Sequence, residues 1–318
     1  MGGLTDNMRG ALLMMGAMAA FTINDAFMKS LSDELPLFQA LLLRGAATTL
    51  FLYGLARGTR GLKLSLRARD WRLVGLRSLA EVGAAWFFIT ALFNMPIANV
   101  TAILQALPLT ITLAGALFLG EAVGWRRMTA IVIGFAGVML IVRPGPEGFN
   151  IFALYALASV LCVTVRDLAT RRLSTEVPSM TVALAASAAV TGFGAAGCLF
   201  GAWVPVSATA AAQLGGAIAF VILGYVCSVM AMRVGDVGFV APFRYTSLVW
   251  ALALGLAVFG HWPDALTLFG AAIVAATGLF TLWRERRVSR QARSASAPVP
   301  GRPEGQVPAA RPAARDRP

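Results

Sequence analysis

The chain has 318 residues, of which 58% are hydrophobic and only 13% are charged, and its mean hydropathy is +0.73. Soluble domains carry about 25% charged residues, so the composition excludes an ordinary soluble protein and indicates that lipid is the solvent. The formal net charge of +12 does not indicate a nucleic-acid partner, because the Lys and Arg residues lie mainly between apolar segments without an RNA-binding signature.

Ten apolar segments follow one another along the chain, each long enough to cross a bilayer as a helix. Spanning backbone must form its hydrogen bonds internally, and these segments do not alternate in polarity, so an all-α membrane protein is predicted and a β-barrel is not. The expected transmembrane helices are residues 9–31, 35–56, 72–94, 97–119, 125–143, 151–171, 178–200, 211–233, 238–259 and 265–283. Residues 1–8 are an expected N-terminal cytoplasmic segment, and residues 284–318 an expected disordered, basic cytoplasmic tail.

A 15-residue pattern recurs in the chain after 142 residues. Residues 22–36 and 164–178 are identical at six positions: Thr22/Thr164, Asp25/Asp167, Leu31/Leu173, Ser32/Ser174, Glu34/Glu176 and Pro36/Pro178. We therefore predict a duplication, with one five-helix repeat at residues 9–143 and a second at 151–283. Because five is an odd number, the second repeat must lie inverted relative to the first, as in many secondary transporters.

The distribution of positive charge predicts the orientation in the membrane. With the N-terminus in the cytoplasm, the outer connections carry one arginine, Arg143, at a helix end. The inner connections carry Arg57, Arg60, Lys63, Arg67, Arg69, Arg72, Arg126, Arg127, Arg171, Arg172 and Arg233. We therefore expect a multi-pass protein of the bacterial inner membrane with both termini in the cytoplasm. The three cysteines form no CxxC or Cys/His cluster, so neither a disulfide framework nor a metal site is expected. No cofactor is expected either.

Charged side chains within the spans mark candidate sites, because a charge near the bilayer centre costs roughly 2.5–3.5 kcal/mol. Arg44 lies about 12 Å inside the outer end of the second span, at 1.5 Å per residue, and is expected to bind an anion or hold a gate. Asn24, Asp25 and Lys29 share the first span. The spacing of Asp25 and Lys29 predicts an ion pair on one helix face, and Asp25 is the candidate proton-binding residue.

Asp167 and Arg171 repeat this spacing in the sixth span, and Arg77 and Glu81 show it in the third. Each pair is expected to neutralise itself. For the Asp25–Lys29 and Asp167–Arg171 pairs, two roles stay open: fixing the rotation of the helix, or taking part in coupling or gating.

Spans three, four and nine hold further candidate contacts for a solute. Pro242 removes a backbone donor and is expected to break the ninth span beside Arg244 and Tyr245. The lining would be completed by Trp86, Asn99 and Gln105, although aromatic residues at helical spacing more often pack in a core.

The chain resembles the drug/metabolite transporter superfamily, and its EamA-type ten-helix members in particular, over about residues 9–283. The matching residues are Asp25, Lys29 and Arg44, together with ALFNMPIANVTAILQALPLTITLAGALFLGE at 91–121 and GFVAPFRYTSLVWALALGLAVFG at 238–260. The LGE at 119–121 is similar to the glycine–acid ending of the family's fourth span, whereas the second copy has His261 there. The resemblance implies a solute cavity between spans three, four, eight and nine.

The resemblance implies a secondary transporter that moves a small organic metabolite by alternating access. Residues 24–31 and 241–250 are most similar to members that take up riboflavin or S-adenosylmethionine, so uptake of a vitamin or nucleoside-type solute such as riboflavin is the first hypothesis. Export of an amino acid or drug is an alternative. A membrane-embedded enzyme acting on a lipid-linked substrate is disfavoured, because one loop His and scattered Cys form no catalytic constellation. The expected partners are a small-molecule solute and membrane lipid, and a homodimer stays open.

Overall fold

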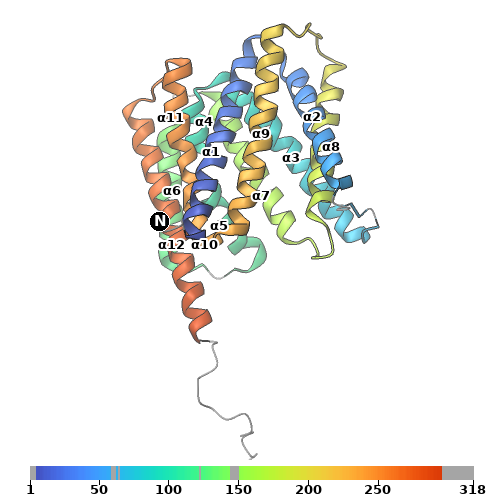
Figure 1. The fold of residues 1–318 in the computed structure, drawn as a ribbon. Helices are drawn as coiled ribbons and strands as arrows, with labels where there is room; N and C mark the ends of the chain where they lie inside the picture. The colour runs from blue at the N-terminus through green and yellow to red at the C-terminus, as the bar shows by residue number, and fades with distance from the viewer. Residues whose placement is uncertain (1–4, 59–61, 64, 122, 144–149, 296–318) are drawn as a thin grey trace, which may run out of the picture.

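The computed structural model describes residues 5–58, 62–63, 65–121, 123–143 and 150–295 (Figure 1). These residues form helices and no strand, and ten helical segments in them are long and apolar enough to cross a membrane. The predicted fold class and number of spans are therefore confirmed. The elements are α1 (Asp6–Ser30), η1 (Leu31–Asp33), α2 (Leu37–Gly58), α3 (Ala68–Asn94), α4 (Ile97–Leu104), α5 (Leu107–Leu119), α6 (Trp125–Val142), α7 (Ile151–Arg171), α8 (Ser179–Cys198), α9 (Ala208–Val234), α10 (Val237–Val240), η2 (Ala241–Tyr245), α11 (Thr246–Phe259) and α12 (Ala265–Ala295).

Two of the ten spans are interrupted helices. The fourth span divides into α4 and α5, because Pro108 has no backbone N–H to donate to the carbonyl of Leu104. The ninth span divides into α10, η2 and α11, and the break predicted at Pro242 is confirmed, since residues 241–245 form a 3-10 turn. Both interrupted spans then end on a glycine in the left-handed region, Gly120 and Gly260, with φ of 68° and 64°.

The C-terminal boundary differs from the prediction. Helix α12 continues to Ala295, so residues 284–295 are helical and the expected start of a disordered tail at 284 is wrong. The reason is local, because residues 284–295 include five Arg and two Ala, which are good helix formers, and no proline comes before Pro298. The rest of the predicted tail, residues 296–318, and residues 1–4 of the predicted N-terminal segment lie outside the described residues.

Helices of the first predicted repeat pack against helices of the second. The first span of each repeat packs against the third span of the other. Helix α1 packs against α9, and α3 packs against α7, while α2 packs against α8 and α6 against α12. Two side-chain hydrogen bonds join residues 142 positions apart: Thr49 Oγ1 with Thr191 Oγ1 at 3.0 Å, and Gln105 Nε2 to Ser247 Oγ at 2.9 Å. A residue on a two-fold axis contacts its own counterpart, so these contacts are consistent with inverted repeats. The inverted relation itself stays a prediction.

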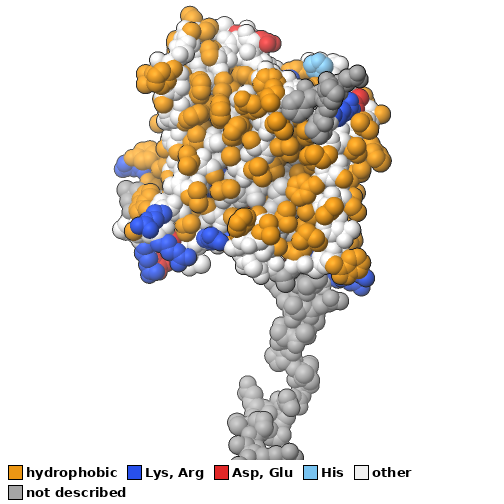
Figure 2. Space-filling model, turned by 180° about the vertical axis from the view of Figure 1, so that it is seen from behind, with side chains coloured by type: hydrophobic (Ala, Val, Ile, Leu, Met, Phe, Trp, Pro, Cys, Tyr) orange, Lys and Arg blue, Asp and Glu red, His pale blue; other side chains and the backbone are white. Residues whose placement is uncertain are grey.

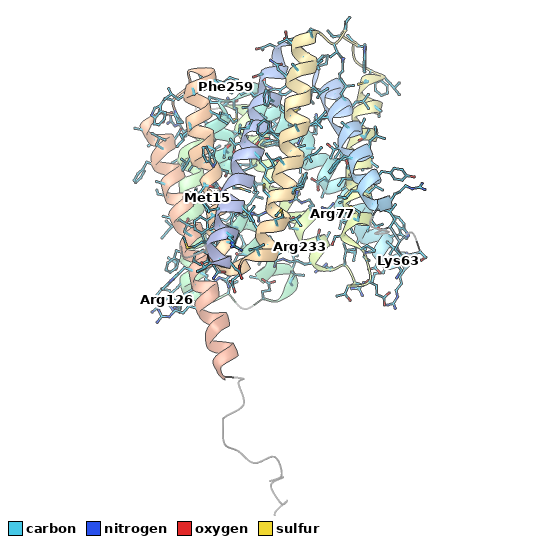
Figure 3. All side chains as sticks on the ribbon, in the orientation of Figure 1. Met15, Lys63, Arg77, Arg126, Arg233 and Phe259 are labelled. Atoms are coloured by element: carbon cyan, nitrogen blue, oxygen red, sulfur yellow. The ribbon has the colours of Figure 1, made fainter. Side chains whose placement is uncertain are left out.

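The two ends of the bundle differ in charge. The start of α1 and the end of α12 lie at the same end (Figure 1), which we call the N-terminal end. Lys63, Arg126 and Arg233 lie toward this end, whereas Phe259 lies toward the opposite one (Figure 3). The space-filling view shows basic side chains gathered at the lower margin and a broad apolar surface above them (Figure 2). Exposed large hydrophobic residues on the outer surface, such as Leu79 at 70% and Phe200 at 92%, suit contact with lipid.

Candidate functional site

Three polar side chains on α1 and α2 form a first group, which we call the Asp25 site: Asn24, Asp25 and Arg44. Asn24 is only 2% exposed, and its Nδ2 donates to Asp25 Oδ1 at 2.8 Å. The charge of Arg44, on α2, acts on the Asp25 carboxylate, yet Arg44 forms no ion pair within 4.0 Å among the described residues. Asn24 Oδ1 and Arg44 Nε are buried without a hydrogen-bond partner. Such partnerless polar atoms are suited to binding a solute's polar groups.

Lys29 does not pair with Asp25, so that prediction is wrong. Its Nζ donates to the carbonyl oxygens of Leu92 at 2.9 Å and Met95 at 2.8 Å, and it also lies 5.8 Å from the centre of the Phe259 ring. The reason is that α3 ends next to α1, and its last carbonyls, at the negative end of the helix dipole, attract a cation. Lys29 therefore ties α1 to the end of α3 and to α11.

A second charged group joins α3, α7 and η2, and we call Arg77, Glu81, Arg166, Asp167 and Arg244 the arginine cluster. The predicted Arg77–Glu81 pair is confirmed at 3.6 Å, and Glu81 also pairs with Arg166 at 3.3 Å. Arg166 Nε donates to Asp167 Oδ1 at 2.9 Å. The side chain of Arg244 is exposed, and its charge interacts with those of Asp167 and Arg166. Figure 3 places Arg77 toward the N-terminal end of the bundle.

The predicted Asp167–Arg171 pair is wrong. Arg171 pairs instead with Glu121 at 2.8 Å, because the left-handed turn at Gly120 brings Glu121 beside the end of α7. Asp167 is held by its neighbour Arg166. Arg166 is absent from the predicted site, although the 142-residue offset, which aligns it with Asn24, was a signal for it. Tyr225, on α9, was also missed; its electrostatic interactions with Arg77 and Arg166 depend on helix packing.

The remaining predicted site residues lie in the interrupted spans. Gln105 is 8% exposed and donates to Ser247 Oγ across the two breaks. Asn99, on α4, is half-buried, and its Oδ1 has no hydrogen-bond partner. Tyr245 is buried and points at α12, where its hydroxyl leaves no room for a side chain at Gly278. Gln105 and Asn99 therefore stay candidate solute contacts, whereas Tyr245 packs between helices.

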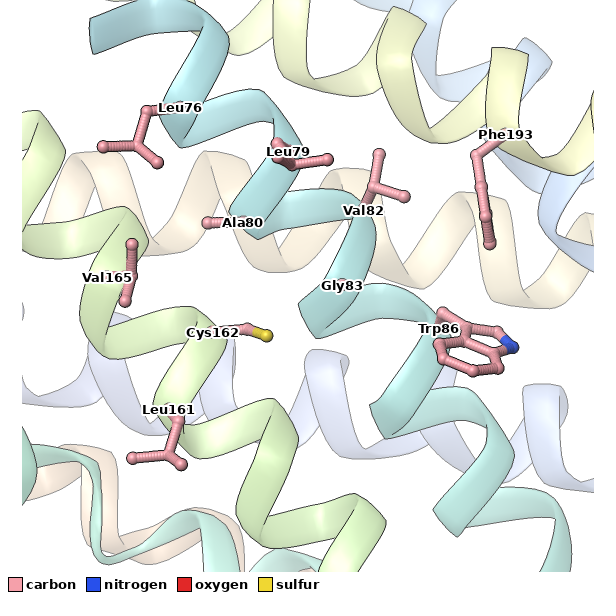
Figure 4. Close-up of a pocket in the computed structure, with 10 residues that line it drawn as sticks. All are labelled: Leu76, Leu79, Ala80, Val82, Gly83, Trp86, Leu161, Cys162, Val165 and Phe193. Atoms are coloured by element: carbon pink, nitrogen blue, oxygen red, sulfur yellow. The ribbon is translucent and has the colours of Figure 1, made fainter.

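Trp86 belongs to an aromatic group on α3, α7 and α8. Its ring lies 4.8 Å from Phe87, 6.1 Å from Tyr155 and 6.4 Å from Phe193. It also forms one wall of a pocket of about 440 Å³, whose lining is apolar and includes Leu79 (Figure 4). Because Leu79 and several other lining residues are exposed on the outer surface, the pocket is a lipid-facing groove, and its lining includes no charged side chain.

Residues 8–143 match the EamA-like transporter family. The first half of this chain is an EamA-like transporter domain. The match confirms the resemblance that the sequence motifs indicated, and it covers the residues predicted to form the first repeat.

Several relatives match this chain over most of their own length. It is 28% identical to a riboflavin transporter of Vibrio cholerae, over 90% of this chain and 97% of the relative. It is 26% identical to an S-adenosylmethionine uptake transporter of Rickettsia prowazekii, over 84% and 90%. It is 26% identical to the pseudopaline exporter CntI of Pseudomonas aeruginosa, over 83% and 93%. A crystal structure with 21% identity has the same fold, with a TM-score of 0.58 over 88% of this chain and 98% of that chain.

These findings place the protein among membrane transporters. It is a multi-pass bacterial membrane protein, and its substrate is a small molecule. The family and the names of the relatives point to transport and not to catalysis. Among the described residues, no three His, Cys, Asp or Glu side chains lie close enough together to hold a metal ion.

Proposed function

We propose that this protein imports a vitamin or nucleoside-type metabolite across the bacterial inner membrane by alternating access, with riboflavin as the first candidate and S-adenosylmethionine as the second. The proposal includes two inverted five-helix repeats, at residues 9–143 and 151–283, and cytoplasmic termini. The observation that carries it is a recurring motif within the spans. Asn24 donates to Asp25, and Arg166 donates to Asp167 at the positions 142 residues later.

The placement of the two motifs supports alternating access. Asp25 lies near the end of α1, far from the N-terminal end of the bundle, whereas Asp167 lies near the end of α7, close to it. Equivalent polar groups therefore approach opposite ends of the bundle. In a transporter built from inverted repeats, rocking of one half against the other exposes one central site to each side in turn.

The substrate class is supported by relatives and by aromatic side chains. The riboflavin transporter of Vibrio cholerae matches over nearly its whole length. Phe87 and Tyr155 offer rings on which a flat heterocycle could stack, and Asn99 and Gln105 offer amide groups for its polar edge. Arg44 and Asn24 would bind further polar atoms of the solute.

The test is growth of a bacterial riboflavin auxotroph at low riboflavin concentration, together with uptake of radiolabelled riboflavin and S-adenosylmethionine. Expression of the wild-type protein is expected to restore growth or increase uptake of one labelled solute, and Asp25→Asn is expected to lose the effect while remaining in the membrane. Arg9→Gln, which changes an exposed charge at the start of α1, serves as the matched control. No rescue and no uptake of either solute would remove the importer proposal.

Export is a second candidate, because the pseudopaline exporter CntI also matches over most of both chains. The order of helices does not fix the direction of net flux. Raised tolerance of the expressing cells to amino acids or drugs, with no uptake of either labelled vitamin or nucleoside, would favour the exporter.

A further inference from the structure

The arginine cluster carries an excess of positive charge. Arg77, Arg166 and Arg244 supply three guanidinium groups, and Glu81 and Asp167 supply two carboxylates, which leaves one positive charge. These groups lie in helices that span the membrane, where an uncompensated charge is costly. A carboxylate group contributed by a ligand would give the three guanidinium groups three carboxylates.

Arg244 is the member of the cluster without a direct partner. Glu81 lies within 4.0 Å of both Arg77 and Arg166, and Asp167 is bound by Arg166. The Arg244 guanidinium makes no hydrogen bond or ion pair among the described residues, although its charge interacts with Asp167 and Arg166. Its side chain is exposed, while Tyr245 beside it is buried against α12. Arg244 is therefore accessible to a ligand, whereas Arg77 and Arg166 each already form an ion pair with a carboxylate.

The position of Arg244 is fixed by the break in the ninth span. Pro242 ends α10, and the 3-10 turn that follows directs consecutive residues to different sides. The carbonyl of Arg244 accepts from Ser247 Oγ at 3.0 Å, and Ser247 in turn accepts from Gln105. The backbone at Arg244 is thus tied to the break in the fourth span, so the guanidinium is presented from an anchored segment.

We propose that Arg244 in the arginine cluster binds a single carboxylate group of the transported solute. The planar guanidinium offers two parallel N–H donors that match the two oxygens of a carboxylate. A phosphate group carries about −1.5 to −2 charges at neutral pH, which exceeds the single positive charge of the cluster and would meet the carboxylates of Glu81 and Asp167. This inference rests on the proposed function, and it selects S-adenosylmethionine, whose amino-acid part carries a carboxylate, over riboflavin, which has none.

The test compares two ligands that differ only in this group. Binding of S-adenosylmethionine and of decarboxylated S-adenosylmethionine to the full chain in lipid nanodiscs is measured by calorimetry, with riboflavin as a third ligand. Wild-type protein is expected to bind the carboxylate form about 10- to 100-fold more tightly, as for a hydrogen bond between charged groups. Arg244→Gln is expected to remove this difference by weakening only the carboxylate form, and Arg244→Lys to restore part of it.

The matched control is Arg233→Gln, which removes an exposed arginine at the same end of the bundle but outside the cluster. It is expected to keep the wild-type preference. Equal affinity of wild-type protein for the two forms, or an unchanged preference in Arg244→Gln, would overturn the carboxylate site. Binding of riboflavin alone would overturn the carboxylate site and leave the proposed importer standing. Binding of none of the three ligands would remove both.

Discussion

In the Asp25 site a neutral amide donates to the carboxylate, whereas at the aligned position of the arginine cluster a guanidinium does so. The geometry is nearly the same, with donor–acceptor distances of 2.8 and 2.9 Å. The charged surroundings of the two carboxylates differ. The charge of Arg44 acts on Asp25, whereas Asp167 belongs to a network of five charged groups. Equivalent backbone positions therefore hold two sites of different electrostatic character, and substitutions in them should not have equal effects.

The largest effect is expected from Arg44→Ala. This change removes the cation of the Asp25 site and leaves a carboxylate without a countercharge, so labelled-solute uptake should fall by about 100-fold or more. Membrane insertion, measured by immunoblot of the membrane fraction, should remain near the wild-type level. Arg57→Ala, at an exposed position of the same helix, is the control and should transport normally. Wild-type uptake by Arg44→Ala would make Arg44 a structural residue.

The two aspartates give the direct comparison of the sites. Asp25→Asn is expected to reduce uptake by about 10- to 100-fold, because Arg44 then lacks a carboxylate. Asp167→Asn is expected to reduce it by about fivefold or less, because Arg166 keeps its pair with Glu81. Initial uptake rates in whole cells at equal expression measure both. Equal losses in the two variants would contradict the difference between the sites.

A smaller effect, on stability, is expected from Lys29→Met. The change removes two hydrogen bonds to the end of α3 while keeping an apolar stem, and it should lower the free energy of unfolding by about 1–2 kcal/mol. Thermal unfolding of the purified protein in detergent measures it. Lys63→Met, which changes an exposed side chain at the N-terminal end, should leave the midpoint unchanged. An unchanged midpoint in Lys29→Met would show that the link between α1 and α3 is not stabilising.

The smallest effect concerns the loop at the end opposite the N-terminal one. The backbone N–H of Thr267 and the Arg143 guanidinium hold the pKa of Asp264 below its usual 3.8. The stabilisation is therefore present above pH 3.8 and is lost as the pH falls through the lower pKa of the folded protein. Thermal midpoints of wild type should drop more steeply below pH 4 than those of Asp264→Asn. Parallel curves for the two proteins would contradict this contribution.

Much of the fold could be predicted from local sequence, but the pairing of charges could not. The positions of the ten spans, the 142-residue offset and the break at Pro242 follow from hydropathy, identity and a missing backbone donor. The ion pairs predicted for Lys29 and Arg171 were wrong, because helical spacing names only the neighbours on the same helix. Both cations found closer acceptors on other elements, the carbonyls that end α3 and the carboxylate of Glu121.

The sequence by itself determined that this chain crosses the membrane ten times and that its two halves share a motif. Both results depend only on the linear sequence, through the hydropathy of each segment and the identity of residues at a fixed offset. Only the tertiary structure decided that Arg166 joins Glu81 and Asp167, that Tyr245 faces α12, and that Arg244 stays accessible without a partner. The physical reason is that the partner of a buried charge depends on which helices pack together, and spacing along a single helix does not contain that information.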